Sequence, residues 1–92
     1  MEVTVACTQM ACSWNLAENL DRAERLVKKA ADQGAQIVLL QELFATPYFC
    51  IDVQERHFDL AQPLQGNPLI ERFQKLAQAR ELVLPISFFE QA

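Results

Sequence analysis

Residues 37–44 read IVLLQELF, four large apolar residues followed by a polar pair and two further apolar residues. An unbroken apolar run of this kind is typical of a strand that is covered on both faces, as in a parallel sheet. It predicts a buried strand over residues 37–40, with Glu42 close behind its end. In open α/β sheets, ligands bind outside the carboxyl ends of the strands. Glu42 is therefore the first candidate for a functional side chain.

The residues before this stretch predict a strand and a helix. Residues 3–9 (VTVACTQ) have the alternation of a short buried strand. From Leu16 onward, apolar residues recur at intervals of three and four, which is the spacing of one helical stripe. Asn15 and Glu18 are spaced as a capping box, and Gly34 suits a left-handed helix end. Strand, helix and strand together predict a βαβ unit.

The other side of this helix carries opposite charges spaced four residues apart. The pairs are Glu18 with Arg22, Asp21 with Arg25, and Glu24 with Lys28. Such pairs stabilise a helix by roughly 0.2–0.5 kcal/mol each. We expect this side of the helix to face solvent.

The second half of the sequence begins with an irregular stretch and continues with a helix. Residues 41–65 are too irregular for one long element, and one helical turn is expected near residues 53–58. Asn67 and Pro68 then predict the start of a second helix, as the N-cap and the first-turn proline. Its apolar spacing predicts an end near Arg80.

Residues 82–89 predict a third strand, in which Pro85 removes one ladder donor and favours an edge position or a bulge. The predicted order is β-α-β-loop-α-β, an α/β fold. Three strands and two helices leave apolar surface and strand edges uncovered. We therefore expect residues 1–92 to form the N-terminal portion of a single domain, without a second domain and with an incomplete sheet.

The composition excludes several classes of function. Of the 92 residues, 51% are hydrophobic and 22% are charged, which is enough apolar material for a folded core. A formal net charge of −4 disfavours binding to nucleic acid or to anionic membranes. Two glycines and one histidine exclude glycine-rich phosphate loops, the nucleophile elbow and two-histidine metal sites. The sequence shows neither a membrane span nor a signal peptide, so we expect a cytoplasmic protein.

The cysteines and the histidine offer only weak candidate sites. Cys7, Cys12 and Cys50 are an odd number without a framework spacing, so we expect free thiols, the first two of them structural. Cys50 lies seven residues before His57, but no third group that would orient a nucleophilic pair is evident. We expect His57 to be a partly exposed loop residue, with a metal ligand or a pH switch as the alternatives. Trp14 is expected to pack where chain segments meet.

Glu42 has the surroundings expected of a general base. Its neighbours Leu40, Leu43 and Phe44 predict partial desolvation, which raises the pKa of a carboxyl group toward neutral pH. The alternative is a carboxylate at a strand end that merely caps a loop.

Three stretches of the sequence resemble the first third of the nitrilase superfamily of carbon–nitrogen hydrolases. They are VTVACTQM (3–10), NLDRAERLVKKAADQGAQIVLLQELF (19–44) and VLPISFFE (83–90). Within the superfamily, QELF followed by PYFC (47–50) most resembles the members that hydrolyse N-carbamoylputrescine. The resemblance implies an αββα sandwich, a homo-oligomer at full length, a small carbamoyl-amine substrate, and neither a metal nor an organic cofactor.

The resemblance also implies a Glu-Lys-Cys triad in which Glu42 is the general base. In this family the Lys and the Cys lie further along, in motifs that are absent here, so Lys75 and Cys50 do not take those roles. Glu42 would accept the proton of the cysteine thiol, and a carbamoyl thioenzyme would form as ammonia leaves. The lysine would stabilise the oxyanion, and water activated by Glu42 would release putrescine as its carbamate.

Tyr48 and Phe49 follow Glu42 closely, and an aromatic wall suits a cationic alkylamine. We predict Tyr48 as a pocket residue, and Phe44 as a weaker candidate because apolar residues beside a strand usually pack in the core. Two alternatives remain open. One is another amidase of the same superfamily, such as one that hydrolyses N-carbamoyl-β-alanine. The other is a non-catalytic α/β module that binds a partner through its open sheet.

Overall fold

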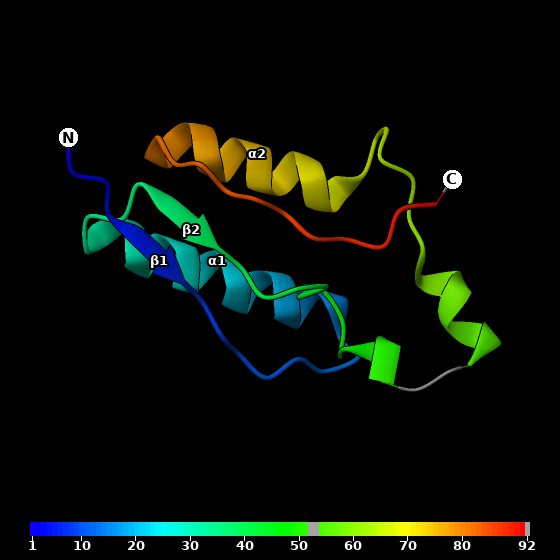
Figure 1. The fold of residues 1–92 in the computed structure, drawn as a ribbon. Helices are drawn as coiled ribbons and strands as arrows, with labels where there is room; N and C mark the ends of the chain where they lie inside the picture. Colours follow the sequence, from blue (N-terminus) through cyan, green and yellow to red (C-terminus); the bar gives the residue numbers. More distant parts are fainter. Residues whose placement is uncertain (52–53, 92) are drawn as a thin grey trace.

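The computed structural model describes residues 1–51 and 54–91, which are arranged around a short parallel sheet (Figure 1). Strand β1 (Val5–Cys7) pairs in parallel with β2 (Ile37–Leu39). On the other edge of β2, the amide of Val83 donates to the carbonyl of Gln36, and the amide of Val38 donates to the carbonyl of Val83, both at 3.0 Å. The spatial order is therefore β1, β2 and the segment at Val83.

Helix α1 (Leu16–Asp32) connects the two strands and begins as the sequence predicts. The amide of Glu18 donates to Asn15 Oδ1 at 3.1 Å, which satisfies one free amide of the first turn. In a capping box, the Glu18 carboxylate would accept in turn from the amide of Asn15. Here that amide donates to Ser13 Oγ instead, at 3.2 Å. Beyond the helix, Gly34 has a φ of 95°, a left-handed conformation that glycine adopts without steric strain.

Helix α2 (Pro68–Arg80) has the predicted boundaries. The amide of Leu69 donates to Asn67 Oδ1 at 3.0 Å, so Asn67 is the N-cap. Glu81 follows the helix as its C-cap and has a φ of 54°, in the left-handed region. In Figure 1, α2 lies beside α1, and the C-terminal extended segment runs between α2 and β2.

Both helices contribute to a single core. Its buried apolar residues are Leu20, Ala23, Val27, Ala35, Val38, Leu40, Phe44, Leu69, Phe73, Leu76 and Leu82. In β2, Val38 is fully buried, whereas Leu39 is 47% exposed. The expectation of a strand covered on both faces is therefore wrong for this chain. Successive side chains of a strand point to opposite faces, and both helices pack on the face that carries Val38.

The region predicted as a third strand forms few ladder contacts. Val83 makes a single parallel bridge to Ile37, and Glu90 makes another to Gln62. Pro85 between them has no amide hydrogen, which limits a continuous ladder. The residues after Glu42 contain two short 3-10 helices, η1 (Phe49–Ile51) and η2 (Glu55–Leu60), in place of the one predicted turn. Val53, within that predicted turn, lies outside the described residues.

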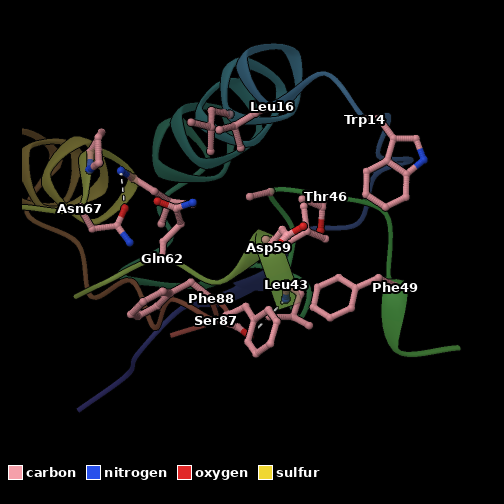
Figure 2. A pocket seen from close by; sticks show the side chains of 16 residues that line it. Trp14, Leu16, Leu43, Thr46, Phe49, Asp59, Gln62, Asn67, Ser87 and Phe88 are labelled. Atoms are coloured by element: carbon pink, nitrogen blue, oxygen red, sulfur yellow. Dashed lines mark hydrogen bonds between the residues drawn. The ribbon is translucent and has the colours of Figure 1, made fainter. Parts of the chain in front are cut away.

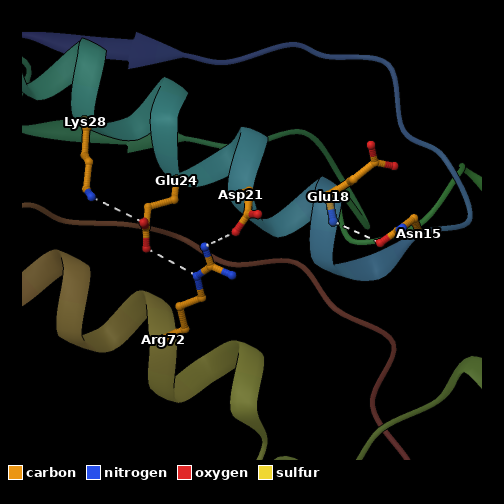
Figure 3. Close-up of polar contacts among 6 residues, drawn as sticks. All are labelled: Asn15, Glu18, Asp21, Glu24, Lys28 and Arg72. Carbon is orange, nitrogen blue, oxygen red and sulfur yellow. Dashed lines mark hydrogen bonds and ion pairs between the residues drawn. The ribbon is translucent and has the colours of Figure 1, made fainter.

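The charged side of α1 does not form the predicted set of pairs. Within the described chain, only Glu24 and Lys28 pair as expected, at 3.3 Å. Asp21 instead accepts from Arg72 of α2 at 2.8 Å, and Glu24 also accepts from Arg72 at 3.2 Å (Figure 3). The prediction failed because it considered only one helix, while α2 places a guanidinium group within reach of both carboxylates. This side of α1 is therefore a contact between helices as well as a solvated surface.

Candidate active site

Glu42 lies just beyond the carboxyl end of β2 and is exposed to solvent. We expected its apolar neighbours to desolvate it partly, and the structure differs. Leu40 and Phe44 turn into the core, where they are 5% and 0% exposed, so they do not shield the carboxylate. Glu42 thus presents a solvent-accessible acid at the edge of the sheet where α/β proteins bind ligands.

Tyr48 lies close to Glu42. The negative charge of Glu42, and after it that of Cys50, raises the pKa of the Tyr48 hydroxyl, because ionisation would place like charges side by side. Tyr48 is 44% exposed, so part of its side chain is accessible from solvent. The structure therefore brings together two of the three predicted site residues, Glu42 and Tyr48.

Phe44, the third predicted site residue, lies in the core. Its ring is fully buried and packs edge to face against Phe73 of α2. Residues 42–45 form a turn beyond β2, so this position depends on the turn and not on the alternation of the strand. Phe44 therefore supports the segment that carries Glu42, and its ring does not face solvent.

The backbone next to Glu42 adopts an unusual conformation that sequence patterns do not reveal. Leu43 has a φ of 51°, in the left-handed region that residues other than glycine, asparagine and aspartate seldom adopt. Its amide donates to Ser87 Oγ at 3.1 Å. On the other side of Glu42, the side chain of Gln41 accepts from the amide of Met10 at 2.8 Å and donates to Cys12 Sγ at 3.3 Å. Neither Ser87 nor Gln41 was predicted as part of the site.

An apolar cavity of about 310 Å³ opens near the same edge of the sheet (Figure 2). It lies between the N-terminal ends of α1 and α2, and its walls include Leu16, Leu43, Phe49, Ser87 and Phe88. This volume is near the lower limit of small-molecule sites. Neither Glu42 nor Tyr48 is among the lining residues that the structure describes. The cavity and the exposed acid are nevertheless neighbours, because Leu43 lines the cavity and directly follows Glu42 in the sequence.

His57 is buried, contrary to the expectation of a partly exposed loop residue. It is 8% exposed, because Trp14 stacks on it at a centroid distance of 6.2 Å and Phe49 lies against it at 5.4 Å. Its Nε2 has no hydrogen-bond partner among the described residues. Trp14 packs between segments as predicted, although 60% of it remains exposed.

All three cysteines are free, as predicted, but their environments differ. Cys7 and Cys50 are exposed, whereas Cys12 is partly buried and donates to the carbonyl of Phe44 at 3.1 Å. Burial raises the pKa of the Cys12 thiol, and the positive charge of Arg22 opposes that effect. Within residues 1–51 and 54–91, no three histidine, cysteine or acidic side chains gather as a metal site would require. No helix in the same part of the chain is long and apolar enough to span a bilayer.

Comparison with known proteins identifies the family of this chain. The profile of the family described as Carbon-nitrogen hydrolase matches residues 4–92. The chain belongs to the carbon–nitrogen hydrolase family, as the resemblance in its sequence indicates.

Two curated relatives and one solved structure illustrate the match. The chain is 52% identical over 91 residues to an N-carbamoylputrescine amidase of Oryza sativa subsp. japonica, covering 99% of this chain and 30% of the relative. It is 39% identical over 88 residues to a citrullinase of Francisella tularensis subsp. tularensis (strain SCHU S4 / Schu 4), covering 96% of this chain and 31% of the relative. A carbon-nitrogen hydrolase from Helicobacter pylori G27 superposes with a TM-score of 0.79 at 26% identity, covering 97% of this chain and 30% of that structure. The chain thus spans about 30% of the length of these relatives.

Proposed function

We propose that the protein containing this chain hydrolyses a non-peptide carbon–nitrogen bond, converting N-carbamoylputrescine to putrescine, ammonia and carbon dioxide. The observation that carries the proposal is the 52% identity, along nearly the whole chain, to a protein named N-carbamoylputrescine amidase. The exposed position of Glu42 at the carboxyl end of β2 supports it, because a general base must be accessible to the group it deprotonates.

In the proposed mechanism, Glu42 works with a cysteine and a lysine supplied from outside these 92 residues. Glu42 accepts the thiol proton as the sulfur attacks the carbamoyl carbon and forms a carbon–sulfur bond. The bond to the terminal nitrogen breaks, and the proton returns from Glu42 to that nitrogen, which leaves as ammonia. The lysine stabilises the negative charge on the carbonyl oxygen during this step.

The second half of the proposed reaction is a hydrolysis. Glu42 accepts a proton from water as the water oxygen attacks the carbonyl carbon of the carbamoyl thioenzyme, and the carbon–sulfur bond breaks. The proton then returns to the sulfur, which regenerates the thiol. The released carbamate loses carbon dioxide to give putrescine. Neither a metal nor an organic cofactor takes part.

Tyr48 is the proposed contact for the far end of the substrate. Its exposed ring lies close to Glu42, and an aromatic face attracts an alkylammonium group. This attraction favours a substrate with a positively charged tail over one that ends in a carboxylate.

A second candidate substrate is citrulline, because the chain also matches a citrullinase along nearly its whole length. Citrulline carries the same ureido group as N-carbamoylputrescine but ends in an α-amino acid. A third compound to test is N-carbamoyl-β-alanine, a ureido compound with a terminal carboxylate. These three compounds share the reacting group and differ in the charge of the tail.

The test is an assay of ammonia release by the full-length protein with these three compounds. We expect the highest kcat/KM with N-carbamoylputrescine. Equal or reversed preference would contradict the proposed substrate, and no hydrolysis of any of them would contradict the proposed reaction. Light scattering on the same sample tests the proposal that the full-length protein is a homo-oligomer, and a monomeric mass would refute that part.

A further inference from the structure

We infer that Ser87 is a positioning residue for Glu42, holding the backbone that presents this acid to the substrate. The inference rests on the proposed function, because it concerns the geometry of the proposed general base. It assigns a role to a side chain that lies 44 positions beyond Leu43 in the sequence and contacts its amide.

The first step of the argument is the conformation of Leu43. A leucine at a φ of 51° suffers a steric clash that glycine avoids, so surrounding contacts must hold the backbone there. The amide of Leu43 donates to Ser87 Oγ at 3.1 Å, as Figure 2 shows. The carbonyl of Leu43 accepts from the amide of Thr46 at 3.4 Å, which closes a turn. Residues other than glycine in such strained backbone conformations often occur at active sites and ligand-binding sites.

The second step is that the residues flanking Glu42 are fixed by other parts of the chain. Gln41 is held by the amide of Met10 and by Cys12. The carbonyl of Phe44 accepts from the Cys12 thiol at 3.1 Å, and its ring is locked in the core. Glu42 is exposed between these anchored neighbours. The backbone that carries this exposed acid is therefore fixed on both sides before the substrate binds.

The third step is the origin of Ser87. Ser87 lies in the extended segment that follows Val83. Val83 itself pairs with β2, through hydrogen bonds with Gln36 and Val38. The serine hydroxyl therefore links the edge of the sheet to the amide immediately after Glu42. If it is removed, Leu43 keeps its steric clash and loses one contact that offsets it, so the peptide between Glu42 and Leu43 is held less firmly.

The experiment compares Ser87→Ala, Ser87→Thr and Ser13→Ala in the full-length protein with N-carbamoylputrescine. We expect Ser87→Ala to lower kcat on the order of ten- to a hundredfold with KM changed less than about twofold, since misplacement of a reacting group affects chemistry more than binding. Ser87→Thr keeps the hydroxyl and should recover most of kcat. Ser13→Ala is the matched control, because Ser13 Oγ also accepts from a backbone amide, that of Asn15, at the start of α1.

A readout independent of activity is amide hydrogen exchange at Leu43. Ser87→Ala should accelerate it, and Ser87→Thr should not. If Ser87→Ala does not fold, Ser87→Cys, which keeps the volume but accepts hydrogen bonds weakly, takes its place with the same expectations.

The outcomes separate this inference from the proposed function. Unchanged kcat or unchanged Leu43 exchange in the Ser87 variant, or an equal loss of kcat in Ser13→Ala, overturns the role of Ser87 and leaves the proposed function standing. If the unsubstituted protein does not hydrolyse ureido compounds, the proposed function is refuted and the positioning role falls with it.

Discussion

The rings of Phe44 and Phe73 meet edge to face, with centroids 5.2 Å apart and an interplanar angle of 79°. Both rings are buried, at 0% and 1% exposure. The contact joins α2 to the segment directly after Glu42. It therefore ties the stability of the fold to the position of the proposed general base.

Phe73→Ala should destabilise the protein by about 3–5 kcal/mol, the range for removing a buried phenylalanine ring. Denaturant unfolding of the full-length protein measures the effect. Phe58→Ala is the matched control, because Phe58 is 71% exposed and its loss should change the free energy of unfolding by less than about 1 kcal/mol. Equal losses in the two variants would contradict the assignment of Phe73 to the core.

Arg72→Gln should weaken the contact between α1 and α2 by about 0.5–1 kcal/mol, the upper part of the range for partly exposed ion pairs. Arg72 lies between Asp21 and Glu24, whereas Arg25, which the sequence pairs with Asp21, makes no such contact in the described chain. Arg25→Gln is therefore the control and should leave stability nearly unchanged. High salt should reduce the difference between the two variants.

Acid should remove part of the same stabilisation. The hydrogen bond from Arg72, and then that from Lys28, lowers the pKa of Glu24, and partial burial opposes them. A group with a lowered pKa in the folded state stabilises the fold above its unfolded pKa, about 4.3 for glutamate, and the contribution disappears as pH falls through the folded value. Unfolding measured from pH 7 to pH 3 should show a shallower acid dependence in Arg72→Gln than in the unsubstituted protein. Identical slopes in the two proteins would show that the hydrogen bond from Arg72 to Glu24 does not contribute to the acid dependence of stability.

Cys12 should react with thiol reagents at least about fivefold more slowly than Cys50, because a partly buried thiol with a raised pKa holds less thiolate. Mass spectrometry of the protein after timed alkylation at pH 8 measures both rates. A Cys12→Ser variant identifies the slow site. Equal rates would show that the thiol contacts with Gln41 and Phe44 open readily.

His57→Phe should leave the melting temperature unchanged or raise it. The imidazole is buried between Trp14 and Phe49, and its Nε2 lacks a partner among the described residues. Replacing an unsatisfied buried polar group by an apolar ring of similar shape is nearly neutral or stabilising. A loss beyond about 1 kcal/mol would indicate that Nε2 makes a hydrogen bond in the folded protein.

Glu42→Gln in the full-length protein should reduce turnover by about 10²–10⁴-fold, the contribution expected of a general base. The protein should remain folded, because the side chain is exposed. Glu2→Gln, another exposed glutamate, makes the same change of charge and should not affect turnover. Near-normal turnover in Glu42→Gln would remove the base from the proposed mechanism.

Local patterns predicted the regular elements well. The caps at Asn15 and Asn67 act on neighbouring amides, so the starts of α1 and α2 could be read from a few adjacent residues. The position of Glu42 after β2 could be predicted equally well, because the apolar run of residues 37–40 determines where that strand lies. Residues 82–89 were harder, since a strand exists only through its partners, and only Val83 among them pairs with β2.

The surroundings of the candidate site depended on contacts that local patterns do not encode. Trp14 and Phe49 bury His57 from separate segments, and Ser87 meets Leu43 across 44 positions. Such contacts leave no periodic signal in the sequence.

The sequence alone therefore determined the helices, the βαβ order, the family and Glu42 as the candidate base. These features depend on interactions between residues a few positions apart, or on motifs made of consecutive residues. Only the tertiary structure decided that Arg72 joins Asp21 and Glu24, that Phe44 lies in the core, and that Ser87 holds the amide after Glu42. The physical reason is that these contacts form only when distant segments pack together, and packing is decided by the whole core at once.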